Sequence, residues 1–307
     1  MSGSHHARGG VLVMKRRALL KQALGTGVLL PLTGPGATPV PCLAEASENV
    51  PWEIVDTNAS LFAWPFRRLP LDTAGKLVAK MRALGICSAW AGSFEGILQR
   101  DITGVNARVA ETCNEYPELT PIGTLNPSLP DWRADLRRCA EEHHMPGIRL
   151  YPGYHGYTLG ESRFQDVFEQ VAGRNLFLQI VVSLEDPRTQ PEWLQVRDVD
   201  PLPLRSLLQS TPAARVQLLN ARPRGGMLTE LASVPGLYWD TARLEGTAGV
   251  PELARGLPPG RVLFGSHAPF LLPEAALIRV HESNQLSEQE LREVYASNAR
   301  RFLRSPA

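Results

Sequence analysis

Polar side chains end several of the short apolar segments of this sequence. Asn58 and Ser60 follow the run Ile54-Val55, Asn220 ends a second run, and His267 follows a third. Amide and imidazole groups bind and polarise carbonyl groups, and an imidazole also accepts a proton near neutral pH. The sequence therefore predicts His267 as a general base or a polarising donor, with Asn220 as a second catalytic residue and Asn58 on the substrate. The alternative for His267 is a packing histidine held by a hydrogen bond.

Four further side chains are candidates for the same pocket. Arg149 ends an apolar run and has the planar fork that binds a carboxylate, or it satisfies loop carbonyls instead. His155 is a third catalytic candidate, and Tyr157 shares its Gly- and Tyr-rich loop; an ordinary loop histidine is the alternative. Glu95 follows another apolar run and is predicted as an acid or a ligand in the site. The alternative is that it caps a helix.

Short β-type segments precede these residues. Each is largely apolar and rich in Val, Ile, Leu or aromatic residues, as is typical of strands that are buried on both faces. The predicted strands are Glu53–Thr57, Ile86–Ala91, Thr120–Leu125, Gly147–Tyr151, Leu176–Val182, Arg215–Leu219, Leu237–Asp240 and Arg261–Phe264.

Helical patterns alternate with the predicted strands. Asp72–Leu84 carries an apolar stripe at helical spacing and is followed by Gly85, a C-terminal stop. Asp131–His144 predicts another helix, and Ser287–Glu290 is a capping box that opens a final helix through Leu303. The Pro-rich stretch 186–203 is predicted as a loop above the fifth strand.

Eight strands in alternation with helices predict an α/β protein, a (β/α)8 TIM barrel that forms a single domain over residues 47–307. The alternative is an open, doubly wound sheet. Such a sheet more often has a Gly-rich phosphate loop after its first strand, and residues 56–60 contain no glycine. In a barrel, chemistry sits at the carboxyl ends of the strands, where the candidate residues are predicted.

Residues 1–46 have the features of an export signal in the right order. Arg16 and Arg17 resemble a twin-arginine motif, an apolar run follows, and Ala44-Glu45-Ala46 offers a cleavage site, with Met14 as an alternative start. The sequence thus predicts an exported, periplasmic protein; a disordered or merely amphipathic leader is the alternative. The sequence contains no stretch of about eighteen or more uncharged apolar residues, so no membrane-spanning helix is predicted.

Charge and cysteine content narrow the partners. The formal net charge is +1 with no basic stripe, which argues against nucleic acid and leaves a small-molecule substrate as the expected partner. Cys87, Cys113 and Cys139 remain after the predicted cleavage, without a C-x-x-C spacing, so neither a disulfide framework nor a thiolate metal site is predicted. Oligomeric state cannot be read from the sequence.

Four segments resemble the amidohydrolase superfamily, specifically its amidohydrolase-related (amidohydrolase 2) branch. They occur in the expected order over roughly residues 53–303. The segments are Ile54-Val55-Asp56, the run from Pro146 to Pro152, the run from Arg261 to Ser266 before Pro269-Phe270, and Ser297–Phe302 with its Asn-Ala pair.

The resemblance implies a metal site whose ligands are substituted here. Such enzymes bind one or two divalent metals through a His-x-His pair on the first strand, histidines on the fifth and sixth, and an aspartate on the eighth, and the metal activates water. At the corresponding positions this sequence has Asn58 and Ser60, Val181, Asn220 and His267. Valine cannot coordinate, and neutral amides are poor zinc ligands. Zinc or manganese would need a rebuilt set, for which His267, His155 and either Glu95 or Asp240 are the candidates.

Three functions follow as hypotheses. The first is a hydrolase for a small carboxylate-bearing ester, lactone or amide, which works without the usual metal as some lactone-cleaving members of the superfamily do. In it, Arg149 and Asn220 hold the substrate and His267 activates water. The second is a metal-dependent hydrolase or decarboxylase with a rebuilt site. The third is a catalytically silent barrel that binds a small ligand or a partner.

Overall fold

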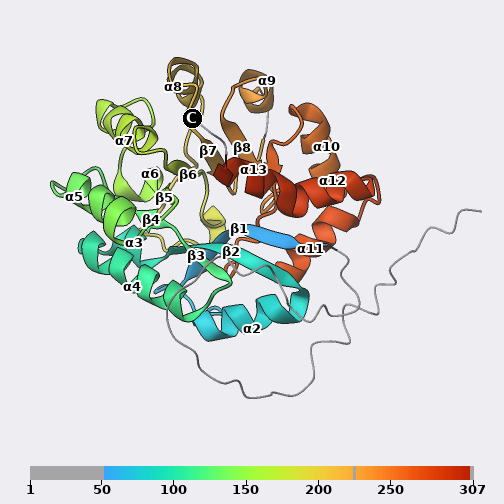
Figure 1. Ribbon diagram of the computed structural model, residues 1–307, viewed down its shortest axis with the longest axis horizontal. Coiled ribbons are helices and arrows are strands. Elements are labelled where there is room, and N and C mark those ends of the chain that lie inside the picture. The colour runs from blue at the N-terminus through green and yellow to red at the C-terminus, as the bar shows by residue number, and fades with distance from the viewer. Residues whose placement is uncertain (1–51, 224–225, 305–307) are drawn as a thin grey trace, which may run out of the picture. The chain divides into compact units, whose positions relative to one another are not determined.

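The computed structural model describes residues 52–223 and 226–304, which belong to one compact unit, residues 44–307. Within this unit, Figure 1 shows strands in the centre and helices around them. The predicted export signal at residues 1–46 lies outside the described residues.

Parallel strands form the centre of the molecule. Two sheets are present, in the orders β1-β2-β3 and β4-β5-β6-β7-β8-β9, and every pair of neighbouring strands is parallel. The strands are β1 (Ile54–Leu61), β2 (Ile86–Ser93), β3 (Leu119–Pro121), β4 (Gly123–Thr124), β5 (Gly147–Leu150), β6 (Phe177–Val181), β7 (Val216–Leu219), β8 (Leu237–Asp240) and β9 (Val262–Leu263).

Backbone hydrogen bonds at two junctions join the two sheets into a ring of eight strand positions. The third predicted strand is interrupted at Ile122, whose N–H donates to Ala91 of β2, so β3 and β4 together fill one position. At the other junction, the N–H of Thr57 donates to Phe264 O, and the N–H of Ser60 donates to Ala268 O. The predicted (β/α)8 barrel is confirmed.

The first strand extends further than the sequence predicts. β1 continues through Asn58 and Ser60 to Leu61, and it pairs with β2 as far as Ser93, with an irregular register between Asp56 and Ala59. Polar residues lie inside this strand because other side chains in the barrel satisfy their hydrogen bonds. The predicted boundary at Thr57 is therefore wrong.

Helix α2 (Ala74–Leu84) shows how the outer layer is held. Thr73 accepts a hydrogen bond from the N–H of Lys76 at its start, and Gly85 ends it with a φ of 71°, a conformation that favours glycine. Its buried face is Leu77, Val78, Met81 and Leu84. Burying each of these side chains contributes about 1.5–3 kcal/mol.

The remaining helices follow the predicted alternation. They are α3 (Glu95–Leu98), α4 (Ile102–Glu115), α5 (Trp132–Arg137), α6 (Pro152–His155), α7 (Ser162–Ala172), α8 (Leu204–Ser210), α9 (Met227–Leu231), α10 (Gly249–Gly256), α11 (Pro273–His281), α12 (Glu288–Arg292) and α13 (Asn298–Arg304). The predicted helix 131–144 changes to a π-helical turn after Arg137, and the final helix has such a turn between α12 and α13. Ser287 and Glu290 form the predicted capping box.

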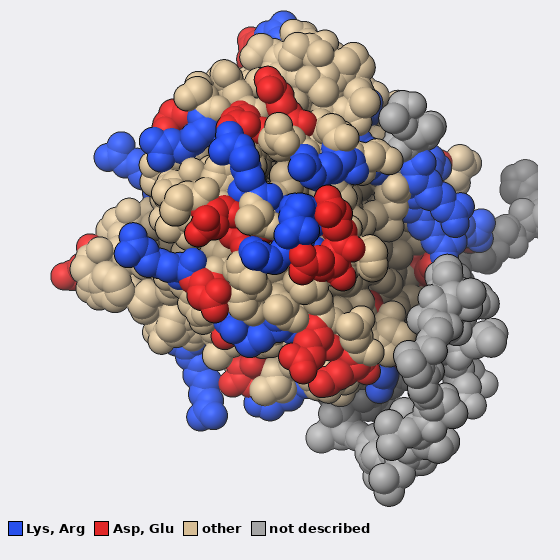
Figure 2. All heavy atoms as spheres, turned by 60° about the vertical axis from the view of Figure 1, so that its left-hand side comes forward, with Lys and Arg blue, Asp and Glu red and all other residues tan. Residues whose placement is uncertain are grey.

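The surface carries both signs of charge. On the face shown in Figure 2, acidic and basic side chains alternate. No helix among residues 52–223 and 226–304 is long and apolar enough to cross a membrane.

Candidate functional site

Arg149 fills the interior of the barrel. It lies on β5 and is 1% exposed. Its guanidinium donates to Gln179 Oε1 (2.8 Å) on β6, to Ala59 O (2.7 Å), and to Ser60 Oγ and Trp90 O, and the hydroxyl of Tyr151 lies beside it. An arginine has five N–H groups, so protein acceptors take four of them. This geometry does not support the predicted role of Arg149 on a substrate carboxylate, because too few N–H groups remain to fork onto one.

Asn58 joins three strands at the position where the family has a metal ligand. Its Nδ2 donates to Asn220 Oδ1 (2.8 Å) at the end of β7 and to Asp240 Oδ2 (2.6 Å) at the end of β8. The N–H of Asn220 donates to the other oxygen of Asp240. The sequence placed Asn58 and Asn220 in one pocket, and the structure brings them together with Asp240 in one buried cluster.

Two glutamines continue this arrangement deeper in the barrel. Gln179 Nε2 donates to Thr57 O and to Gln217 Oε1, and Gln217 Nε2 donates to Thr57 Oγ1. The two hydrogen-bonded groups adjoin at Thr57 and Asn58, which are consecutive in β1, and we call them together the interior network: Thr57, Asn58, Arg149, Gln179, Gln217, Asn220 and Asp240. Its members are buried.

Two carboxyl groups of the barrel interior have a pKa above the ordinary value of an aspartate. The pKa of Asp240 is raised to about 7 because the effect of burial outweighs the hydrogen bonds from Asn58, Asn220 and Ala242, which lower it. Burial also raises the pKa of Asp56, whose oxygens accept hydrogen bonds from the hydroxyl and the N–H of Ser266. Asp240 therefore titrates near neutral pH, where an acid or base is most useful.

His267 lies beyond the end of β9 and has one nitrogen without a partner. Its Nε2 lies 2.6 Å from Leu184 O, so this nitrogen carries the proton, and Phe270 stacks on the ring at 5.2 Å. Nδ1 is buried and has no hydrogen-bond partner among the described residues. Burial, together with the charges of Arg243, Arg149 and Arg67, lowers the pKa of His267 to about 3. The imidazole is thus neutral, with a free lone pair.

Aromatic side chains cover the carboxyl end of the barrel. They follow β1, β2, β5 and β9, and we call them the mouth cluster: Trp64, Phe66, Phe94, Tyr154 and Phe270. Trp64 lies at the centre, with ring centroids 5.0 to 6.2 Å from the other members. Trp64 Nε1 and the Tyr154 hydroxyl are buried without hydrogen-bond partners among the described residues. Both atoms can therefore still form a hydrogen bond to a bound molecule.

The structure separates the other predicted site residues from this centre. Glu95 accepts two hydrogen bonds from Arg108 at 2.9 and 2.7 Å, an ion pair on the outside of the barrel. His155 Nε2 contacts Gly96 O, its Nδ1 is buried without a hydrogen-bond partner among the described residues, and burial lowers its pKa to about 4. Tyr157 stacks on Phe164 in the main core, with its hydroxyl buried. The contacts of Glu95 and Tyr157 do not support their predicted site roles, and the role of His155 stays a prediction.

The residues at the family's ligand positions do not fit a metal ion. Asn58 presents its amide nitrogen, a donor, toward Asp240; Val181 packs in the apolar mouth region; His267 is held by Leu184. The predicted rebuilt set is not assembled either, because His155 and Glu95 have the contacts given above. In the part of the chain that the structure describes, no group of three or more His, Cys, Asp or Glu side chains is suited to hold a metal.

Sequence reasoning missed several residues of this region. Gln179 and Gln217 interrupt otherwise apolar strands, and a polar residue in such a strand is a signal for an interior network. Trp64 and Arg243 come three residues after a strand end, in loops that carry no motif. Only the rule that loops at the carboxyl ends of barrel strands form the site could have indicated them.

Comparison with known proteins agrees with this architecture. A family model described as Amidohydrolase matches residues 65–305. The chain belongs to the amidohydrolase family. No curated protein matched the sequence.

Solved structures of similar fold include several decarboxylases. A 2,6-dihydroxybenzoate decarboxylase from Rhizobium is 15% identical with a TM-score of 0.64, covering 83% of this chain and 99% of its own. The 5-carboxyvanillate decarboxylase from Sphingomonas paucimobilis is 15% identical with a TM-score of 0.65, covering 82% and 99%. A dihydroxybenzoic acid decarboxylase from Polaromonas, with bound manganese and 2-nitroresorcinol, is 14% identical with a TM-score of 0.63, covering 83% and 98%. At these identities the likeness concerns the fold.

Proposed function

We propose that this member of the amidohydrolase family is a hydrolase that works without the family's metal, on a small ester, lactone or amide that carries a carboxylate. The observation that carries the proposal is the contact of Asn58 with both Asn220 and Asp240. An amide that bridges a second amide and a carboxylate fills the space of a metal and uses the lone pairs that a metal would need.

His267 is the proposed base. Its fixed tautomer leaves Nδ1 free to accept a proton from water, while the water oxygen forms a bond to the substrate carbonyl carbon. The bond to the leaving group then breaks, and the leaving group takes the proton from His267. Because the imidazole is neutral throughout the usual assay range, its base form is always present. The low pKa also makes it a weak base in the closed site.

The test is a screen of lactones, esters and amides with the purified full chain, followed by His267→Asn. Asparagine accepts the positive φ of 57° at this position better than alanine does, so the variant isolates the loss of the imidazole. We expect a fall in kcat/KM of about 10²-fold, the lower end of the usual contribution of a general base, because the low pKa makes His267 a weak base. His143→Asn is the matched control and leaves the activity unchanged. Activity that survives His267→Asn contradicts the proposed base.

A second candidate is a ligand-binding barrel without turnover, which the closed mouth cluster favours. Trp64 and its neighbours cover the end of the barrel, and the unpartnered Trp64 Nε1 and Tyr154 hydroxyl offer hydrogen bonds to a bound molecule. An inactive screen together with tight binding of a small molecule would support this candidate. The same screen includes aromatic acids: release of carbon dioxide that depends on added manganese would support the metal-dependent decarboxylase, the second hypothesis drawn from the sequence, and contradict our proposal.

Export and partners are proposed on sequence grounds alone. We expect the mature chain in the periplasm after twin-arginine transport, and a small molecule in place of nucleic acid as its partner. Cell fractionation of the full chain and of an Arg16→Lys, Arg17→Lys variant tests the first point, since the variant should stay inside the cell.

A further inference from the structure

Arg243 is a half-buried arginine at the carboxyl end of the barrel, three residues after β8 ends. Among the described residues, its guanidinium makes one hydrogen bond, to Ser183 Oγ at 3.1 Å, and no ion pair. An arginine has five N–H groups, so most of this donor capacity is unused. Arg149, by contrast, makes four hydrogen bonds.

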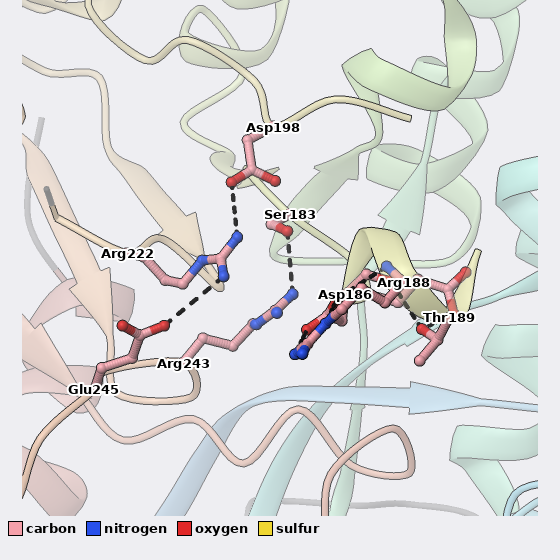
Figure 3. Close-up of polar contacts among 9 residues, drawn as sticks. Ser183, Asp186, Arg188, Thr189, Asp198, Arg222, Arg243 and Glu245 are labelled. Atoms are coloured by element: carbon pink, nitrogen blue, oxygen red, sulfur yellow. Dashed lines mark hydrogen bonds and ion pairs between the residues drawn. The ribbon is translucent and has the colours of Figure 1, made fainter. Parts of the chain in front are cut away.

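The carboxylates around Arg243 are bound to other arginines. Asp198 and Glu245 lie 3.1 and 3.8 Å from Arg222, and Asp186 lies 2.7 Å from Arg188. Figure 3 shows Arg243 between these two groups, directed toward Ser183. Burial lowers the pKa of Arg243 and the charge of Arg222 also lowers it, whereas the nearby Asp198, Asp186 and Glu245 raise it. Among the described residues none of these carboxylates forms an ion pair with Arg243, and a partly desolvated guanidinium with unused donors is a site that a further anion stabilises.

The position of Arg243 relates it to His267. Three consecutive residues after β6 each contact a different group: Ser183 contacts Arg243, Leu184 accepts from His267, and Glu185 pairs with Arg67. Ser183 and Leu184 are each 5% exposed. A group bound to Arg243 therefore lies beside the segment that holds the proposed base.

We propose that Arg243, with the hydroxyl of Ser183, forms the subsite for the carboxylate of a small ligand at the barrel mouth. The inference rests on the proposed function for the identity of the ligand, a small carboxylate-bearing molecule. The guanidinium forks onto the carboxylate, and the rest of the ligand extends toward His267 and the mouth cluster. This assigns to Arg243 the role that the sequence suggested for Arg149.

Binding to the full chain is measured by calorimetry with two matched pairs of probes: benzoate against benzamide, and phenylacetate against phenylacetamide. The aromatic rings suit the mouth cluster, and each amide keeps the shape of its acid without the charge. We expect each carboxylate to bind the unaltered protein at least tenfold tighter than its amide. Arg243→Gln should remove this preference and leave amide binding unchanged.

Arg205→Gln is the control for the loss of one positive charge, because Arg205 is an exposed arginine paired with Glu230. Arg243→Lys keeps the charge but not the fork, and should retain part of the preference. If Arg243→Gln does not fold, as judged by circular dichroism, Ser183→Ala and Arg243→Lys decide the matter, since each should weaken carboxylate binding. No preference for carboxylates in the unaltered protein, or a preference that survives these variants, overturns the subsite.

The outcome is distinguishable from that of the proposed function because binding needs no turnover. Carboxylate binding that depends on Arg243 in a protein that hydrolyses nothing contradicts the hydrolase and leaves the subsite standing. Hydrolysis with no difference between charged and neutral substrates contradicts the subsite and the carboxylate of the proposed substrate, and leaves the metal-free hydrolase standing.

Discussion

The interior network and the residues above it differ in how completely their polar groups are paired. Within the network, Arg149 donates four hydrogen bonds and Asn58 bridges Asn220 and Asp240, and Asn220 Nδ2 is the one buried polar side-chain atom left without a partner among the described residues. At the mouth, His267 Nδ1 has no partner, and neither does Trp64 Nε1, among the residues that the structure describes. Both regions are buried, so burial alone does not distinguish them. The difference indicates that the network is structural and that the mouth is built to meet a further molecule.

The largest expected effect comes from the same substitution in the two regions. Arg149→Met leaves several buried acceptors without donors and should lower the free energy of unfolding by about 3–5 kcal/mol. Arg243→Met removes one hydrogen bond and an unpaired charge, so the change should stay within about 1 kcal/mol. Urea denaturation of both variants measures the difference. Equal losses would mean that the two regions are not distinct in this respect.

A second comparison uses pH. The pKa of Asp240, about 7, lies above its ordinary value of 3.8, so the folded protein binds a proton that the unfolded chain releases, and stability falls as pH rises between these values. The pKa of His267, about 3, lies below its ordinary 6.5, so the unfolded chain binds the extra proton and stability rises with pH in that window. The two groups act with opposite sign.

Variants should therefore diverge in opposite directions from the unaltered protein. The free energy of unfolding of Asp240→Asn and of His267→Asn is measured in urea at about four pH values between about 4.5 and 7. Asp240→Asn should gain stability relative to the unaltered protein as pH rises, and His267→Asn should lose it. Curves that shift in the same direction would show that one of the two groups titrates normally in the fold.

The smallest expected effect compares two tyrosines three residues apart. The hydroxyl of Tyr151 donates to Ser93 O at 3.1 Å and contacts Arg149, so Tyr151→Phe should cost about 1–2 kcal/mol of stability. The hydroxyl of Tyr154 has no partner among the described residues, so Tyr154→Phe should change stability by less than about 0.5 kcal/mol. Thermal unfolding followed by circular dichroism resolves the two; a larger loss for Tyr154→Phe would contradict the assignment of the mouth.

The barrel was predictable from the sequence because short apolar strands and helix signals are local features. The stripe in α2 with Gly85 behind it and the capping box at Ser287 both appear where expected. The extent of β1 was not predictable, because Asn58 and Ser60 read as loop residues until their partners on distant strands are known.

The candidate site was predicted in part. Asn58 and Asn220 do meet, because the side chain of Asn58 on β1 reaches across the barrel to the end of β7. Arg149 and Glu95 have other partners, and His155 and Tyr157 contact Gly96 and Phe164. The type of a side chain indicates which bonds it can make, and only the fold decides which acceptors reach it first. Arg149 is the clearest example: its fork was identified, and the carbonyls that occupy it belong to residues 59 and 90.

The central claim is that Asn58, Asn220 and Asp240 bind one another where relatives bind a metal. Metal content, and the effect of metal removal on activity, test this claim most directly. The full chain, purified without chelator, is assayed by elemental analysis, and its activity on the best substrate of the screen is measured before and after dialysis against a chelator. We predict substoichiometric zinc and manganese, and activity that chelation leaves unchanged, because Asn58, Asn220 and Asp240 use one another's ligand atoms. One equivalent of either metal, with activity lost on chelation and restored by that metal, would contradict it.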